Sequence, residues 1–158
     1  MGGSGIEPLV LFRTVGHNRV LLDKLRSTGS YLLNFGTLEP LEREIVILRT
    51  CARCGSEYEW GVHVALFAPA VGLSDRRVAA TVIDDDAWTP RQSLLVRLVD
   101  ELHDDHAVSD DLWESLRAVW SAAQLVELVM LVGQYHTVSF VTNAFALAPE
   151  PFGARFPS

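Results

Sequence analysis

The sequence is poor in cysteine, lysine and long apolar runs, and each shortage excludes a class of protein. Two cysteines among 158 residues lie three positions apart, so they cannot cross-link distant parts of the chain. There is a single lysine and the net charge is −7, which disfavours nucleic acid, because phosphate binding requires a basic face. The first residues lack the regions of a signal peptide, and no apolar run reaches the ~18 residues that span a bilayer. We therefore expect a cytoplasmic protein with no nucleic-acid or membrane partner.

Strand signals are also absent, since no segment alternates in polarity between Asn-Gly or Asp-Gly turns. The long segments between glycines and prolines have instead the period of a helix. The sequence predicts an all-α, single-domain bundle of about seven helices, with a flexible leader at 1–5, the domain at 6–150 and a C-terminal tail at 151–158. A short helix is expected at 8–15, and the main helices at 18–34, 37–54, 56–71, 75–82, 90–103, 109–120 and 121–146.

The stretch from Glu42 to Gly72 combines ionisable side chains with core-forming residues. Ser56, Glu59 and His63 are spaced by three and four, so they share one face of a helix. A carboxylate and an imidazole within reach of each other form a proton-transfer pair. A break at Gly55 would fold this helix onto the preceding one and bring Glu44 towards His63. The alternative for Glu59 and His63 is a structural ion pair on a helix surface.

Cys51 and Cys54 resemble a redox pair, but their position argues against that role. A reactive thiolate is favoured at the N-terminus of a helix, whereas these residues fall at the end of one. Arg53 offsets this disadvantage only in part. Zinc would need two further ligands, and none has suitable spacing along the sequence, so no metal is expected. Small buried cysteines without chemistry are the simpler interpretation.

The last and most apolar helix carries polar residues that need partners or a cavity. Among them, Gln134 and His136 are candidates for a second wall of the site, and Gly133 allows close approach. The alternative for His136 is a core histidine with satisfied hydrogen bonds. His17, His103 and His106 are expected to be solvated.

Several segments together resemble the carboxymuconolactone decarboxylase family, which also contains the alkylhydroperoxidase D-like proteins. The resemblance covers about residues 8–150. The segments are Glu42-Arg43-Glu44, Ile47-Leu48-Arg49, Ser56-Glu57-Tyr58-Glu59-Trp60-Gly61-Val62-His63, Trp88-Thr89-Pro90, Asp100-Glu101-Leu102 and Val132-Gly133-Gln134-Tyr135-His136.

The peroxidase branch of that family has a glutamate, eleven intervening residues and then Cys-x-x-Cys-x-x-x-His. On this sequence the glutamate and the histidine fall on Glu44 and His63, whereas the two cysteine positions hold Ser56 and Glu59. Cys51 and Cys54 lie five residues too early. The resemblance therefore implies decarboxylase-like rather than peroxidase chemistry.

The resemblance implies a cofactor-independent acid–base enzyme of the lyase, decarboxylase or isomerase type, acting on a small oxygenated or carboxylated molecule. His63 would move the proton, with Glu59 and Glu44 completing the relay. The residues expected to bind substrate are Tyr58, Ser56, Arg49, Trp60, Gln134 and His136. It also implies a homo-oligomer, a trimer or a hexamer. Two alternatives stay open: a thiol peroxidase acting through Cys51 and Cys54, and a non-catalytic helical ligand-binding or scaffold protein.

Overall fold

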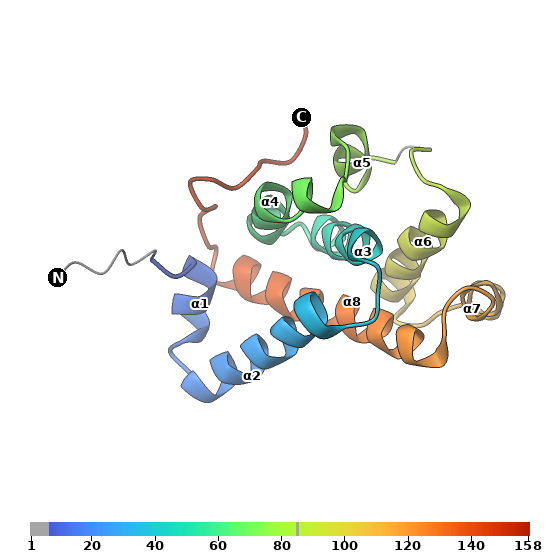
Figure 1. Cartoon of the computed structure of the whole chain (residues 1–158). Helices are drawn as coiled ribbons and strands as arrows, with labels where there is room; N and C mark the ends of the chain where they lie inside the picture. The colour runs from blue at the N-terminus through green and yellow to red at the C-terminus, as the bar shows by residue number, and fades with distance from the viewer. Residues whose placement is uncertain (1–6, 85) are drawn as a thin grey trace.

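The computed structural model describes residues 7–84 and 86–158, and this part of the chain contains helices and no strand. The expected leader at 1–5 lies outside the described residues. The prediction of an all-α fold is confirmed, with eight α-helices in the described ranges rather than about seven (Figure 1). They are α1 Val10–Val15, α2 Arg19–Ser30, α3 Pro40–Arg53, α4 Glu57–Leu66, α5 Asp75–Ala80, α6 Pro90–Asp105, α7 Asp110–Arg117 and α8 Ala122–Ala144.

Most helices begin where the sequence offers a capping side chain. The side chains of Thr89 and Ser121 each accept a hydrogen bond from the backbone N–H of a glutamine three residues later. The side chain of that glutamine accepts one from the backbone N–H of the capping residue, which completes a capping box. Ser74 and Ser109 cap α5 and α7 through their side chains. These short polar residues satisfy N–H groups that the first helical turn leaves free.

Three expected boundaries are wrong, and each has a local cause. The predicted helix 18–34 is α2 followed by a π-helical turn, Tyr31–Phe35. The predicted helix 56–71 ends at Leu66, because Pro69 has no N–H to continue it, and a 3₁₀ turn, Pro69–Val71, follows. The predicted helix 37–54 begins only at Pro40, because the N–H and hydroxyl of Thr37 donate to Glu127 of α8 instead.

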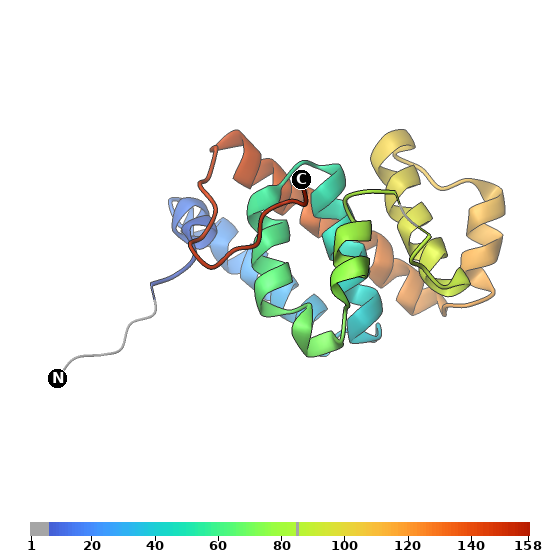
Figure 2. The ribbon, with the colours of Figure 1, turned by 90° about the horizontal axis from the view of Figure 1, so that it is seen from above.

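Helix α3 forms the centre of the protein, and it packs against α4, α6 and α8 (Figures 1 and 2). Its buried side chains include Ile45, Ile47 and Leu48, which are fully inaccessible to solvent. Burial of apolar side chains on this scale is the main stabilising contribution to a helical domain.

The C-terminal tail packs on its own chain rather than extending away from it. After α8 it crosses α4 (Figure 2), where the Ala154 N–H donates to the Gly61 carbonyl at 3.1 Å. The Phe156 and Trp60 rings lie 5.2 Å apart. A Cβ on Gly61 would lie 2.2 Å from the Ala154 carbonyl oxygen, so this contact requires glycine.

Helix α8 is the one helix in the described ranges that is long and apolar enough to cross a membrane by length and composition. Half of its most apolar segment is buried inside the protein. The core helix of a soluble protein has the same properties, so this helix is weak support for a membrane span.

Candidate functional site

The turn between α3 and α4 brings the ionisable residues together. Gly55 has a φ of 66°, a left-handed conformation that glycine adopts without strain. Ser56 follows as the N-cap of α4, where its side chain accepts from the Glu59 N–H. The Ser56 hydroxyl also lies 2.7 Å from the Thr142 hydroxyl of α8. The turn folds α4 back along α3, which brings His63 to Glu44.

His63 contacts three polar side chains at the centre of the molecule. Its Nδ1 lies 2.7 Å from Glu44 Oε2, and its Nε2 lies 3.4 Å from Glu59 Oε1. The Tyr135 hydroxyl, from α8, lies 3.1 Å from the same Nε2. The imidazole also stacks on Phe67, with ring centres 4.5 Å apart. Glu44, Glu59, His63 and Tyr135 are all buried, and we call them the His63 cluster.

The carboxylates decide the charge of the imidazole. Burial alone lowers the pKa of His63, but hydrogen bonds and charge attraction from Glu44 and Glu59 raise it to about 9. His63 is therefore an imidazolium at neutral pH. Arg43 adds a second cation, because its Nε donates to Glu44 Oε1 at 3.2 Å. Two cations thus balance two carboxylates in the core, as a buried ionic group requires.

Tyr135 stays protonated in this setting. Burial and the nearby charges of Glu59 and Glu44 raise the pKa of its phenol well above the ordinary value. The hydroxyl is therefore available to donate a hydrogen bond to an oxygen, while its own oxygen accepts from the Nε2–H of the charged His63.

A cavity of about 350 Å³ opens beside the imidazole. This volume lies in the range of small-molecule sites. Within the described residues, Glu59 Oε2 is buried without a hydrogen-bond partner, although Glu59 lines the cavity. The walls are mostly apolar. Polar groups come from Glu59, His63, Tyr135, Gln134 and, at the exposed α2 side, Arg26 and Ser30.

Four of the predicted site residues meet here: Glu44, Glu59 and His63 form the cluster, and Gln134 lines the cavity. Sequence reasoning missed Tyr135 and Arg26. The available signal for Tyr135 was its place in the buried stripe of α8, four residues after Leu131 and three before Val138.

Three predicted residues on α4 serve the fold instead of lining this cavity. The Tyr58 hydroxyl donates to Glu150 and accepts from the Leu11 N–H, which attaches both ends of the chain to α4. The Trp60 indole donates to the Thr81 hydroxyl at 2.9 Å. Ser56 acts as the helix cap.

Arg49 does not reach the cavity either. Its guanidinium binds Asp100 of α6 through two hydrogen bonds of 2.8 and 2.9 Å, and it also donates to the Thr81 carbonyl. The expectation that Arg49 faces the site is wrong for this geometry, because a buried arginine is held by a carboxylate of its own. Arg26 is the arginine at the cavity.

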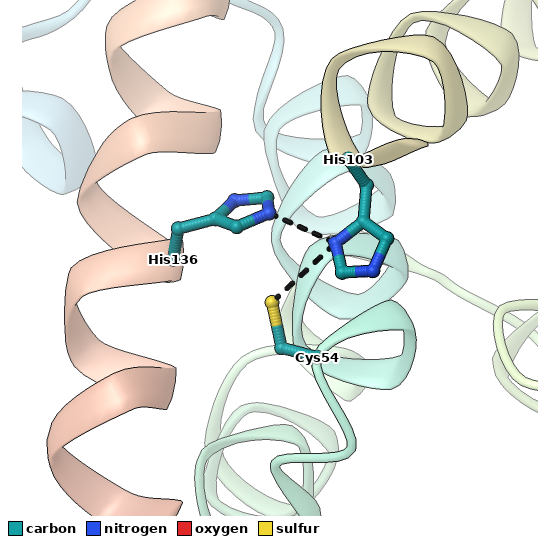
Figure 3. Close-up of side chains that lie close together, drawn as sticks. All are labelled: Cys54, His103 and His136. Carbon is teal, nitrogen blue, oxygen red and sulfur yellow. Dashed lines mark hydrogen bonds between the residues drawn. The ribbon is translucent and has the colours of Figure 1, made fainter. Parts of the chain in front are cut away.

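His136 belongs to a different place in the molecule. Its ring lies near His103 and Cys54, and none of the three lines the cavity beside His63 (Figure 3). The expectation that His103 is simply solvated is also wrong, since it is partly buried against His136.

The thiols are poorly placed for redox chemistry. Burial raises the pKa of Cys51 well above the ordinary value, and the charge of Glu59 raises it further. Burial also raises the pKa of Cys54. Reactive cysteines need a lowered pKa, so both thiols are in their unreactive form.

The fold and the site together define an all-α protein with a buried imidazolium, two carboxylates and a small-molecule cavity. Solved structures with a similar fold include the following two. An uncharacterized peroxidase-related protein from Silicibacter sp. TM1040 has a TM-score of 0.79 at 15% identity, over 89% of this chain and 76% of its own. A protein of unknown function from Agrobacterium tumefaciens, described as a candidate antioxidant defence protein AhpD, also has a TM-score of 0.79, at 19% identity over 86% of this chain and 94% of its own.

At these identities the likeness concerns the fold. The chain has the alkylhydroperoxidase D-like fold, as the sequence resemblance implied. No family model matches the sequence, and no curated protein matches it.

Proposed function

We propose that this protein is a cofactor-independent enzyme that uses acid–base catalysis on a small oxygenated or carboxylated molecule. The observation that carries the proposal is the free oxygen of Glu59. Among the described residues it lacks a hydrogen-bond partner, it is buried, and it belongs to a residue that lines a cavity beside an imidazolium. A buried acceptor without a partner is costly unless a ligand supplies the donor.

The roles follow from the charge of each group. Glu59 is the base that accepts a proton, and the Nε2–H of His63 is the acid that returns one. Glu44 does not face the reactants; it positions the imidazole and keeps it charged through Nδ1. The Tyr135 hydroxyl donates to an oxygen that becomes negative during the reaction.

Two reactions use this set without any further group. In an isomerisation, Glu59 removes a proton from carbon, and His63 returns one to another position. In a decarboxylation, the bond to the carboxylate carbon breaks, CO₂ leaves, and the electron pair remains as an enolate. His63 then protonates the enolate at the carbon that carried the carboxylate, and it regains its proton from water. Arg26 at the cavity rim would hold a substrate carboxylate.

Exchange of solvent deuterium into substrate tests the proposal without knowledge of the product. Lactone acids and β-keto acids would be incubated with the protein in D₂O and followed by NMR, together with CO₂ release. We expect His63→Gln and Glu59→Gln to lower turnover by about 10²–10⁴-fold, the usual contribution of a general acid or base. His17→Gln, which changes an exposed histidine, serves as the control. If both site variants retain the wild-type rate on an accepted substrate, the assignment is wrong.

A thiol peroxidase acting through Cys51 and Cys54 is a second candidate. The descriptions of the two similar structures favour it, whereas the raised thiol pKa values count against it. Peroxide turnover that Cys54→Ser abolishes would support it, and thiols that remain unreactive to peroxide would exclude it.

A non-catalytic binding protein is the third candidate, and it would use the same cavity. It would bind a ligand there but would catalyse no reaction that depends on His63.

We also propose that the chain forms a homo-oligomer. Helix α8 exposes three large apolar residues: Val126 is 65% exposed, Met130 57% and Phe140 63%. Val126 and Met130 line an apolar hollow of about 600 Å³ with Trp113 and Trp120. Exposed apolar surface of this kind is typical of subunit contacts. Light scattering on the full chain would give its mass, and a monomer that Met130→Glu leaves unchanged would contradict the proposal. A cytoplasmic location stays a prediction.

A further inference from the structure

A second group of reactive side chains lies outside the proposed catalytic site. Cys54 at the end of α3, His103 of α6 and His136 of α8 point towards one another (Figure 3), and we call them the Cys54 cluster. His103 Nδ1 lies 3.0 Å from His136 Nε2 and 3.9 Å from Cys54 Sγ. All three ligand atoms lie within 4.8 Å of one another.

These separations approach those of a tetrahedral zinc site. Zinc binds imidazole nitrogen at about 2.05 Å and thiolate sulfur at about 2.3 Å, so tetrahedral angles put two nitrogens about 3.3 Å apart and a nitrogen and sulfur about 3.6 Å apart. The observed distances of 3.0 and 3.9 Å differ from those values by only about 0.3 Å. The third pair, Cys54 Sγ and His136 Nε2, lies within 4.8 Å.

The His136 ring is already oriented for a metal. Its Nδ1 lies 2.9 Å from the Val132 carbonyl oxygen, which can only accept, so Nδ1 carries the hydrogen. The other ring nitrogen, Nε2, therefore faces Cys54 and His103, and it is the atom available for a metal. A hydrogen bond from the second ring nitrogen to a carbonyl is the usual support of a metal-binding histidine.

The surroundings keep these imidazoles available. In the residues that the structure describes, neither ring has a carboxylate within salt-bridge distance, in contrast to His63, although Asp100 and Asp104 lie near enough to His103 to act on its charge. The backbone of Cys54 is held to α8, because Asn143 Nδ2 donates to its carbonyl oxygen at 2.8 Å. The three ligands therefore come from three helices whose relative positions the core fixes.

One coordination position would remain open. His103 and His136 line a surface hollow of about 380 Å³ together with His106 and Phe140. Three protein ligands and one open position are the arrangement of a catalytic zinc ion, whereas structural zinc ions have four protein ligands. A water molecule or a small anion could occupy that position.

We propose that Cys54, His103 and His136 bind one Zn²⁺ per chain, at a site separate from the His63 cluster. The sequence could not indicate this site, because its ligands are separated by 49 and 33 residues and meet only through the packing of α3, α6 and α8. The proposal is independent of the acid–base function.

Metal binding to the full-length, chelator-treated and reduced protein tests the proposal. Zn²⁺ would be titrated against a chromogenic chelator, and Co²⁺ would serve as a spectroscopic probe of thiolate ligation. We expect one Zn²⁺ per chain and a sulfur-to-cobalt charge-transfer band. Loss of even a supporting residue lowers zinc affinity by about 10–100-fold, so Cys54→Ser and His136→Gln should each lower it by at least about 100-fold and change or abolish the band.

Cys51→Ala and His17→Gln are the matched controls, because they remove the other cysteine and an exposed histidine. Both should retain the affinity and the band. His103→Gln is an independent ligand variant in case another fails to fold, as judged by circular dichroism. Zinc binding that survives all three ligand variants, or a wild-type affinity no higher than theirs, would overturn the proposal.

Discussion

The His63 cluster and the Cys54 cluster place the same side chain in opposite electrostatic settings. His63 is 2% exposed and lies between two carboxylates, so it carries a proton. His103 and His136 are half-buried and lie beside a thiol and each other. Burial and the neighbouring His136 lower the pKa of His103. The surroundings of each imidazole thus suit His63 to the acid role, and His103 and His136 to the ligand role, that we propose for them.

Nδ1 shows the difference most directly. In His63 it binds the Glu44 carboxylate, which stabilises the charged ring, whereas in His136 it donates to a backbone carbonyl, which orients the ring so that Nε2 faces the other two side chains. One core helix, α3, contributes to both clusters, with Glu44 in its first half and Cys54 at its end. Both clusters therefore depend on the position of the same helix, although the chemistry that we propose for them differs.

The largest expected effect comes from removing the charge of Glu44. Glu44→Gln leaves His63 and Arg43 with one carboxylate fewer in the core, and breaking a buried ion pair costs about 3–5 kcal/mol. Urea unfolding followed by circular dichroism would measure the loss. His136→Gln in metal-free protein removes the hydrogen bonds of the ring to His103 and to the Val132 carbonyl, each of which contributes about 0.5–1.5 kcal/mol. Equal losses in the two variants would contradict the contrast between the clusters.

The pH dependence of stability should follow from the charge of His63. Its pKa is raised to about 9 in the folded protein, above the ordinary value of about 6.5. Its contribution is complete below about pH 6.5, because the ring is protonated in both the folded and unfolded states. Between about pH 6.5 and 9 only the folded state holds the proton, so stability falls as the pH rises, by about 3 kcal/mol in total.

The difference between wild type and His63→Gln isolates this effect from other groups that titrate at high pH. Unfolding free energies at about pH 6, 8 and 10 would give the slope for each protein. His17→Gln should keep the wild-type slope, since that histidine is exposed. A wild-type slope identical to that of His63→Gln would show that the imidazole is neutral.

Local spacing predicted the His63 cluster well, because most of it lies within twenty residues. The i, i+4 relation placed Glu59 beside His63, and the glycine turn brought Glu44 to the same point. Helix periodicity likewise predicted the all-α fold, since an apolar stripe is a local property of the sequence.

Contacts between distant helices could not be predicted in this way. Arg49 is a plausible anion ligand by its place near the motif, but Asp100, fifty-one residues later, binds it. His136 lies next to Tyr135 in the sequence, yet the helical rotation of about 100° per residue turns it to another face of α8. The tail has no periodicity, and its course is decided by contacts with Gly61 and Trp60.

The two cysteines should differ measurably in the rate at which a thiol reagent modifies them. Cys51 is fully buried, whereas Cys54 is partly exposed at the second cluster. A thiol reagent should modify Cys54 at least about 100-fold faster in the native protein, because Cys51 reacts only when the structure opens locally. Mass spectrometry of time points would assign the sites. Comparable rates would place both thiols in contact with solvent, and Cys54→Ser supplies the rate of Cys51 alone.

The smallest expected effect comes from removing the Tyr135 hydroxyl, which contacts His63 but does not determine its charge. Tyr135→Phe preserves the buried ring but removes the hydroxyl at 3.1 Å from Nε2, which should lower stability by about 1 kcal/mol. The pKa of His63 should stay near 9, because its rise is due to Glu44 and Glu59 rather than to the phenol. An NMR titration of the imidazole, with Glu44→Gln as the comparison, would measure both values. If Tyr135→Phe lowered the pKa as much as Glu44→Gln, the charge of His63 would depend on the hydroxyl, and the carboxylates would no longer explain how the two clusters differ.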